Sequence, residues 1–155
     1  MKIYKATIKD LSEIDRIYIG GSTDETKLQF PKKNLKTINQ ELERYSNARR
    51  QGFRRELKNK NHYWIVAEID KRVVAFGQAF IKNKNVGILE KIYVDKRYRK
   101  KKIGMKIFKT LINWLKKKKV KSIQSGIYWK NKPSIKLNEK FGFKPVSLKM
   151  ELKLK

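Results

Sequence analysis

The sequence predicts a mixed α/β fold, in which a mostly antiparallel sheet carries helices on its faces. Residues 62–94 hold three apolar, β-rich runs separated by short turns, which is typical of an antiparallel meander. After the meander, strand-like and helix-like patterns alternate along the chain. Neither a linker nor a repeat divides the 155 residues, so we expect one domain over residues 1–155.

A short strand and several helices are predicted before the meander. Residues 2–6 have the composition of a strand. Asp10 and Glu13 have the spacing of a capping box, which predicts a helix that begins there and ends at the Gly20–Gly21 pair. Residues 35–57 predict one or two further helices, because their apolar side chains recur at helical spacing.

The strands of the meander are expected at residues 62–69, 72–81 and 86–94. The turns between them fall at Asp70–Lys71 and at residues 82–85, where polar residues interrupt the apolar runs.

The later elements follow from periodicity. Apolar residues recur every four positions over residues 103–115, which predicts a core-facing helix. A strand is predicted over residues 120–128 and a helix over residues 131–142, with Pro133 in its first turn. Residues 146–155 alternate without a break between apolar and polar, which predicts a half-buried terminal strand. The predicted order is therefore β-α-α-β-β-β-α-β-α-β.

The net charge of +27 predicts contact with a polyanion or an acidic partner, such as a nucleic acid or the ribosome. The alternative is that the lysines, which occur in every segment, form a solvated surface. The sequence leaves both interpretations open.

Other residue types exclude some kinds of site. The chain has no cysteine and a single histidine, His62, so disulfides and thiolate or multi-histidine metal sites are excluded, and we expect no metal. No apolar run approaches the roughly 20 residues that span a bilayer. The N-terminal segment lacks the apolar core of a signal peptide, so we expect a soluble cytoplasmic protein that has no membrane partner.

Residues 86–107 are the most informative stretch, because they predict a strand, a short basic loop and the start of a helix. The first amides of a helix lack partners, and its dipole is positive at that end. A basic loop at such a helix N-terminus is suited to hold phosphate.

Three motifs resemble one family. The run VDKRYRKKKIG at residues 94–104 is similar to the pattern R/Q-x-x-G-x-G/A. NKPS at residues 131–134, with LNEKFGF at residues 137–143, is similar to N-x-x-A followed by L-Y-E-K-x-G-F. IYKAT at residues 3–7, with Asp10, resembles the opening strand and helix start. Over nearly its whole length the chain resembles the GNAT superfamily of acyl-CoA-dependent N-acyltransferases.

This resemblance implies a sheet of about six to seven strands flanked by about four helices. It implies an N-acetyltransferase that moves an acetyl group from acetyl-CoA to a primary amine, by direct attack in a ternary complex. The amine acceptor stays unidentified. The implied coenzyme-binding residues are Ile92, Tyr93, Val94, Arg99, Lys100, Lys101, Lys102, Ile103, Gly104, Met105, Asn131, Ser134 and Asn138.

Three positions depart from the family pattern. Lys102 stands where the first loop glycine is usual, and Lys96 replaces a common proline. Asn138 stands where many relatives carry a tyrosine that is thought to protonate the departing thiolate. An amide side chain can form hydrogen bonds but cannot act as a general acid.

Glu90, Tyr128 and Asn138 are the candidate catalytic residues. Glu90 shares strand parity with Ile92 and Val94, so we expect it to face an apolar side, where desolvation would raise its pKa toward that of a general base. The alternatives are a structural partner for a lysine, or a bulge that turns Glu90 outward. Tyr93 and Tyr128 are lesser candidates for proton relay, and deprotonation through ordered water is equally open.

The acceptor pocket is expected around residues 19–45 and 128–130, with Asp24, Glu41 and Glu43 as its acidic contributors. The other function left open is a nucleic-acid- or ribosome-associated binding protein on the same scaffold. The edge of the terminal strand leaves a homodimer open as well.

Overall fold

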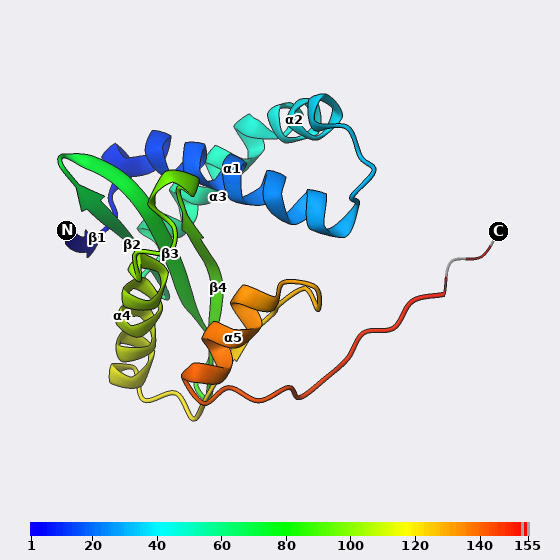
Figure 1. Ribbon diagram of the computed structural model, residues 1–155. Helices are drawn as coiled ribbons and strands as arrows, with labels where there is room; N and C mark the ends of the chain where they lie inside the picture. The colour runs from blue at the N-terminus through cyan, green and yellow to red at the C-terminus, as the bar shows by residue number, and fades with distance from the viewer. Residues whose placement is uncertain (153, 155) are drawn as a thin grey trace.

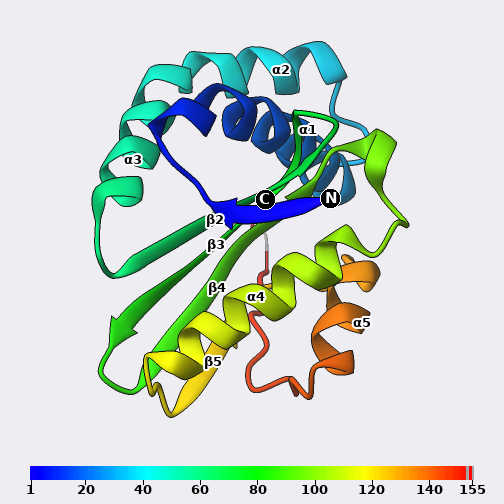
Figure 2. The ribbon, with the colours of Figure 1, turned by 90° about the vertical axis from the view of Figure 1, so that its left-hand side faces the viewer.

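The computed structural model describes residues 1–152 and 154. Helices α1–α3 cover one face of a central sheet, and helices α4 and α5 cover the other (Figures 1 and 2). In the described part the sheet has five strands in sequence order, and β5 alone is parallel to its neighbour. They are β1 (Lys2–Lys5), β2 (His62–Ile69), β3 (Arg72–Asn83), β4 (Val86–Val94) and β5 (Ser122–Ser125).

Five α-helices and two short 3-10 turns complete the described part, and none of these helices combines the length and apolar character needed to cross a membrane. These helices and the five-stranded sheet confirm the mixed α/β class and the antiparallel meander that the sequence predicts. The α-helices are α1 (Leu11–Gln29), α2 (Leu35–Arg44), α3 (Ser46–Lys58), α4 (Ile103–Lys117) and α5 (Lys132–Lys140), and the 3-10 turns are η1 (Ile8–Asp10) and η2 (Lys96–Tyr98).

The sheet separates two apolar cores. The core under α4 is mainly aliphatic and includes Ile65, Val74 and Leu111, each with no exposed surface. The core under α1 and α3 is richer in aromatic rings, with Trp64 stacked on Phe76 at 5.7 Å between ring centroids. The sheet is therefore held from both sides, and only its edges are open.

Helix α1 is longer than the sequence predicts. It continues through Gly20 and Gly21 to Gln29, so the expected break at the glycine pair is wrong. A Cβ added to Gly21 would lie 2.0 Å from a ring carbon of Tyr93. Gly21 therefore allows the helix to approach β4 closely, and this packing outweighs the low helix propensity of glycine.

The start of α1 also differs from the prediction. The capping box lies one turn earlier, where the Asp10 carboxylate accepts a hydrogen bond from the Thr7 N–H at 2.8 Å and Thr7 caps η1. Asp10 is the N-cap residue of α1 but makes no side-chain cap bond to that helix, so the proposed pairing with Glu13 is wrong.

The predicted terminal strand is absent from the described residues, so the sheet has five strands rather than six or seven. Residues 146–152 are irregular, and Figure 1 shows them running away from the body. A strand is stabilised by ladder hydrogen bonds to a neighbour, and alternation of residue types does not supply one. Lys153 and Lys155, the last polar positions of the pattern, lie outside the described residues.

Helix α1 is tied to α3 by a buried carboxylate. Asp15 is 1% exposed, and its two oxygens lie 2.6 Å from Arg49 Nε and 2.7 Å from Arg50 Nε. The Arg49 side chain is itself buried, and it also donates a hydrogen bond to the carbonyl of Leu42 on α2 at 2.7 Å. This bond connects α2 to the same group. One carboxylate thus fixes the three helices of this layer.

We predict that Asp15→Ala lowers the free energy of unfolding by about 3 kcal/mol or more, because it leaves a buried guanidinium without its carboxylate. Urea unfolding measures the loss. Glu13→Ala is the control: it breaks a half-exposed pair with Arg16 and should cost less than about 1 kcal/mol. Equal losses for the two variants would contradict this role of Asp15.

Candidate active site

A cleft opens where β4 and β5 separate. The two strands pair only from Val86 opposite Ser122 to Leu89 opposite Ser125. Beyond that point β4 continues to Val94, whereas the chain after β5 turns away toward α5 (Figure 1). The separation leaves a cleft of about 100 Å³, lined by Glu25, Leu89, Glu90, Ile92, Tyr93, Phe108, Ser125, Gly126, Ile127, Tyr128, Asn131, Ser134, Leu137 and Asn138.

The edge of β4 that faces this cleft carries backbone donors. Asp95 donates its N–H to Val74 on β3 at 2.8 Å. Donors alternate along an antiparallel strand, so the N–H groups of Ile92 and Val94 point away from β3, to the side that β5 has left. Such amides are suited to stabilise negative charge on a carbonyl oxygen held in the cleft.

Glu90 lines the cleft, but not as its strand parity predicts. Lys91 is opposite Gln78 and Leu89 is opposite Ala79, so Glu90 is the extra residue of a β-bulge. The bulge puts Leu89 in the core and leaves the Glu90 side chain 44% exposed. The expectation that Glu90 faces an apolar side is therefore wrong, and the bulge that turns it outward is observed.

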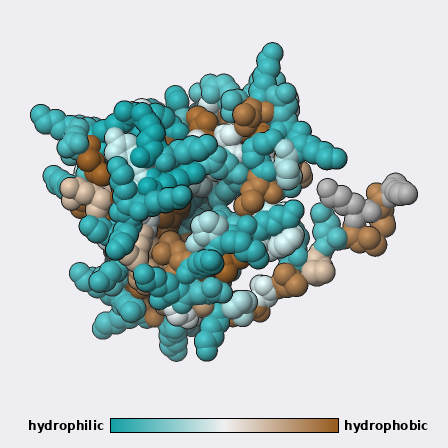
Figure 3. Space-filling view, viewed as in Figure 1, coloured by the Kyte–Doolittle hydropathy of each residue, from teal (hydrophilic) through white to brown (hydrophobic). Residues whose placement is uncertain are grey.

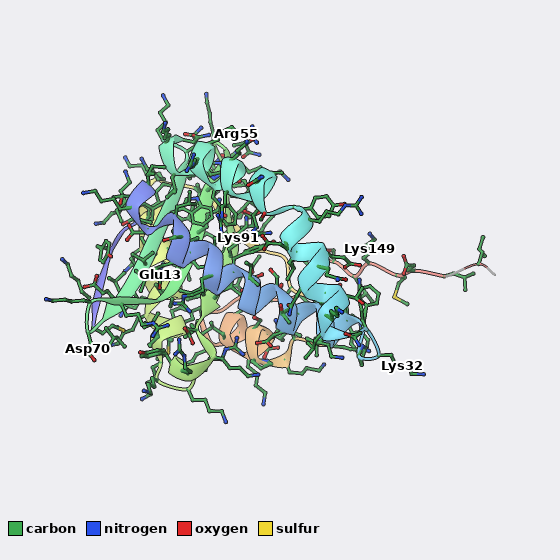
Figure 4. All side chains as sticks on the ribbon, turned by 90° about the horizontal axis from the view of Figure 1, so that it is seen from above. Glu13, Lys32, Arg55, Asp70, Lys91 and Lys149 are labelled. Atoms are coloured by element: carbon green, nitrogen blue, oxygen red, sulfur yellow. The ribbon has the colours of Figure 1, made fainter. Side chains whose placement is uncertain are left out.

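Lys91 holds the Glu90 carboxylate at the mouth of the cleft. The Lys91 ammonium contacts Glu90 and donates to Gln78 Oε1 at 2.9 Å. Gln78 is fully buried and donates to Glu56 on α3 at 2.8 Å. Figure 4 places Lys91 near the middle of the molecule, whereas Lys32 and Arg55 lie at its rim. Glu90 is thus anchored to the buried layer.

A second carboxylate, Glu25, reaches the same cleft from α1. Its Oε2 accepts a hydrogen bond from the Tyr93 hydroxyl at 2.8 Å. No lysine or arginine of the described residues forms an ion pair with it. Glu25 is not among the predicted site residues, because the sequence predicts that this helix ends at the glycine pair. The signal was an apolar helical face, Ile14, Tyr18 and Gly21, that continues four residues later to a glutamate.

The Tyr93 hydroxyl is a donor in this arrangement. Burial, followed by the nearby negative charge of Glu25, raises the pKa of Tyr93 well above its usual range. The phenol therefore keeps its proton across the physiological range. It can orient the Glu25 carboxylate, but it is a poor base.

Helix α5 forms the opposite wall. Asn131 caps its start by accepting a hydrogen bond from the Ser134 N–H at 3.3 Å, with Pro133 in the first turn, as the sequence predicts. Asn138 is buried on the inward face of α5. Its Nδ2 donates to the Ser134 carbonyl at 2.9 Å, while its Oδ1 is buried without a described partner. Tyr128 lines the cleft just before this helix.

The loop from β4 to α4 is held by Asp95. This carboxylate caps η2 and lies 2.7 Å from Arg16 Nη1 of α1. Hydrogen bonds from Arg97 and then from Arg16 hold the pKa of Asp95 well below its usual range, so it stays ionised. The loop is thereby fixed to α1 and to the end of β4.

The N-terminus of α4 is open. Lys102 is the N-cap residue in a left-handed conformation, with φ 60°, and makes no side-chain cap bond. Lys100 is also left-handed, with φ 62°. The first helical bond runs from Lys106 to the Lys102 carbonyl, which leaves the amides of residues 103–105 outside the α4 ladder. The side chain of Ile103 is buried, so it can contribute only its backbone to an anion site.

A second cavity of about 360 Å³ lies between α1 and this loop. Val94 and Arg99 line it, but the Arg99 side chain is already engaged, 2.6 Å from Asp24 Oδ2 and 3.1 Å from the Val94 carbonyl. Asp24 therefore lines this second cavity and is paired with Arg99. Glu41 is paired with Lys33. Glu25 and Glu90 are the carboxylates of the β4–β5 cleft.

The described residues hold no group of three or more His, Asp or Glu that could surround a metal ion.

We predict that Lys102→Gly raises the free energy of unfolding by about 0.5–1 kcal/mol, because glycine adopts the left-handed conformation without the Cβ penalty. Lys101→Gly removes the same charge at a position without a positive φ, and should instead lower the stability by a comparable amount. Chemical denaturation compares the two variants. A loss of stability in both would mean that residue 102 is not strained.

The comparisons with known proteins agree with this architecture. A PaiA N-acetyltransferase from Thermoplasma acidophilum, solved with coenzyme A, is similar at 20% identity and a TM-score of 0.73, over 92% of this chain and 89% of that one. An aminoglycoside 6'-N-acetyltransferase from Acinetobacter haemolyticus is similar at 17% identity and a TM-score of 0.69, over 100% and 99%. A tetramutant of the BH1408 protein from Bacillus halodurans has 18% identity and a TM-score of 0.78, over 99% and 100%.

These likenesses show the fold. The family is shown by the sequence itself, since residues 26–143 match the acetyltransferase (GNAT) family. That stretch contains the β4–α4 loop, both walls of the cleft and most of the elements around them. The chain therefore belongs to the GNAT family of acetyltransferases.

Proposed function

We propose that this protein transfers the acetyl group of acetyl-CoA to a primary amine in the cleft between β4 and β5. The observation that carries the proposal is the free edge of β4: Ile92 lines a cleft that also holds two carboxylates, and Val94 lines the neighbouring cavity. Amides that polarise a carbonyl, beside groups that can receive a proton, are what acyl transfer to an amine requires.

The residues present fit the proposed acetyl donor. The amides of residues 103–105, with the lysines at 100–102, form a cationic, donor-rich end suited to a diphosphate. The open side of β4 suits an extended, amide-containing arm, which can add to a strand edge by backbone hydrogen bonds. Acetyl-CoA would supply the activated acetyl group as a thioester, and the similar PaiA enzyme was solved with coenzyme A.

Two carboxylates handle the acceptor amine in this proposal. An ammonium group has no lone pair, so it must lose a proton before attack. Glu25, oriented by the Tyr93 hydroxyl, and Glu90, held by Lys91, both line the cleft and can bind the cation and accept that proton. With Asn138 in place of a tyrosine, the thiolate leaves without a dedicated acid, which is chemically tolerable because a thiolate is a fair leaving group.

The acceptor class that these groups favour is a small cationic amine. Carboxylates are scarce in this chain, 14 against 41 Lys and Arg, yet two of them meet in one cleft. An acceptor with a single reactive ammonium matches this arrangement. A similar fold occurs in an aminoglycoside 6'-N-acetyltransferase, so aminoglycosides belong in the panel of amines to be tested, beside peptide N-termini and simple alkylamines.

The rest of the positive charge is not needed for this reaction. Figure 3 shows hydrophilic residues over most of the visible face, with apolar residues scattered among them. This distribution favours a solvated surface as the main role of the lysines. Contact with a nucleic acid or the ribosome remains a prediction, which a steep loss of binding with salt would support.

We predict that Gly104→Glu weakens acetyl-CoA binding by at least about tenfold, because it places a carboxylate at the open end of α4. A Cβ at residue 104 would meet only Val94 Cγ2, at 3.6 Å, so the fold should tolerate the change. Asn113→Glu adds the same charge on the exposed side of α4 and should bind like the wild type. Titration calorimetry with acetyl-CoA decides, and equal affinities for the two variants would oppose a diphosphate site here.

We predict that Glu25→Gln lowers kcat/KM for the amine by about a hundredfold or more, the usual range for loss of a general base, and leaves the acetyl-CoA affinity unchanged. The assay follows thiol release with the amine panel. Glu43→Gln is the matched control, since Glu43 is exposed on α2 and lines neither cavity. Similar rates for both variants would remove Glu25 from the mechanism.

A further inference from the structure

Helix α4 differs in charge from the rest of the molecule. Ten of the 14 Asp and Glu lie within residues 10–70, where acidic and basic side chains are mixed. Between Asp95 and Glu139, by contrast, the chain has 16 Lys or Arg and no acidic residue. That stretch includes all of α4 and the loops on either side of it. Charges that are mixed elsewhere are therefore of one sign along α4.

The exposed positions of α4 form one stripe along its outer side. They are three or four residues apart, which places them on one face of the helix, opposite the buried positions that pack on the sheet. These positions are Lys106, Lys109, Asn113, Lys116 and Lys117. In Figure 2 α4 lies in front of the sheet, with its outer side toward the viewer. A helix rises about 1.5 Å per residue, so the stripe is about 16 Å long.

Further lysines lie at the C-terminal end of the stripe. Residues 118–121 hold three exposed lysines. The Lys121 N–H donates to the Asn85 carbonyl at 2.8 Å, which brings the β3–β4 turn to this end of α4. Lys82 and Lys84 are exposed in that turn. Two segments that are distant in the sequence thus gather their cations at one end of the stripe.

These lysines are not neutralised within the chain. Among the described residues, no lysine from 100 to 121 forms an ion pair with a carboxylate. Like charges three or four residues apart destabilise a helix, so the stripe has a cost that the packing of α4 on the sheet offsets. A bound polyanion would remove that repulsion.

The stripe lacks the groups that other polyanionic or acidic partners use. The exposed large apolar side chains of the described residues lie outside α4, whereas protein interfaces are centred on buried aromatic or apolar anchors. Trp114 of α4 is stacked on Tyr63, 5.0 Å between ring centroids, and Lys118 Nζ lies 5.6 Å from its ring centroid. Its ring is therefore engaged and cannot serve as the stacking platform that holds a single strand.

We propose that the outer side of α4 binds the phosphate backbone of a nucleic-acid duplex. A duplex presents one phosphate per about 1.7 Å of its axis, so a stripe about 16 Å long can meet several phosphates. Such contacts position a duplex without reading its sequence. This inference does not depend on the acetyl-transfer proposal, because the stripe shares no residue with the β4–β5 cleft.

Two fourfold variants of equal net charge test the proposal. The α4 variant carries Lys106→Gln, Lys109→Gln, Lys116→Gln and Lys117→Gln. The control variant carries four exposed changes outside α4: Lys5→Gln, Lys9→Gln, Lys36→Gln and Lys60→Gln. Fluorescence anisotropy with a DNA duplex of about 20 base pairs measures the slope of log K against log salt. The α4 variant should lose about 3 units of that slope, since each phosphate contact contributes about 0.9. The control should keep the wild-type slope. Equal slopes for the two variants, or a wild type that does not bind the duplex, would overturn the proposal.

A single charge gives a second, milder test. Asn113→Glu places a carboxylate in the middle of the stripe and should weaken duplex binding at least about tenfold. Gln40→Glu adds the same charge on the exposed side of α2 and should bind the duplex like the wild type. Since Asn113→Glu should leave acetyl-CoA affinity unchanged, loss of duplex binding is distinguishable from loss of the coenzyme site. Circular dichroism should show a folded chain for every variant.

Competitors identify the kind of partner. Single-stranded DNA and polyglutamate, each at the same concentration of charge, should displace the duplex at least about tenfold less well than unlabelled duplex. Polyglutamate that competes equally would make the stripe a surface for acidic proteins. A single strand that binds more tightly would mean that bases are held as well as phosphates. Either result would refute a duplex site on α4.

Discussion

The separation of β4 from β5 after Leu89 and Ser125 is the feature on which the site depends. If the strands stayed paired to Val94, the Ile92 and Val94 amides would be used in the ladder and no cleft would form. The bulge at Glu90 lies next to the point of separation, and bulges bend a strand and end regular pairing. The extra residue in β4, Glu90, thus lies where the sheet opens, and its own carboxylate is exposed there.

The other parts of the site hold this opening in place. Gly21 lets α1 pack directly on Tyr93, which brings Glu25 to the cleft, and Asp15 ties the same helix to the layer behind it. Asp95 fixes the loop that follows β4 to Arg16 of α1. Helix α1 therefore connects the Glu25 side of the cleft to the open N-terminal end of α4, and strain at Lys102 is tolerated at the loop where that end begins.

Sequence reasoning located the elements that are encoded locally. The basic loop before α4 and the helix that starts at Asn131 with Pro133 in its first turn followed from short motifs, and both are observed. Features that depend on long-range packing could not be predicted from the sequence. Strand parity could not reveal the bulge at Glu90, and a glycine pair could not be distinguished from a helix end without the Tyr93 ring that requires it. The alternation of residues 146–152 indicated a strand but not where its partner lies.

Hydrogen exchange of the β4 amides, followed by NMR with and without acetyl-CoA, tests whether the opened edge of β4 receives the acetyl donor. We expect the amides of Ile92 and Val94 and those of residues 103–105 to become protected when acetyl-CoA is added. The amides of Tyr93 and Asp95, which already face β3, should change little and serve as internal controls. Unchanged exchange at Ile92 and Val94 in the presence of saturating acetyl-CoA would contradict the claim that the opened edge of β4 receives the acetyl donor.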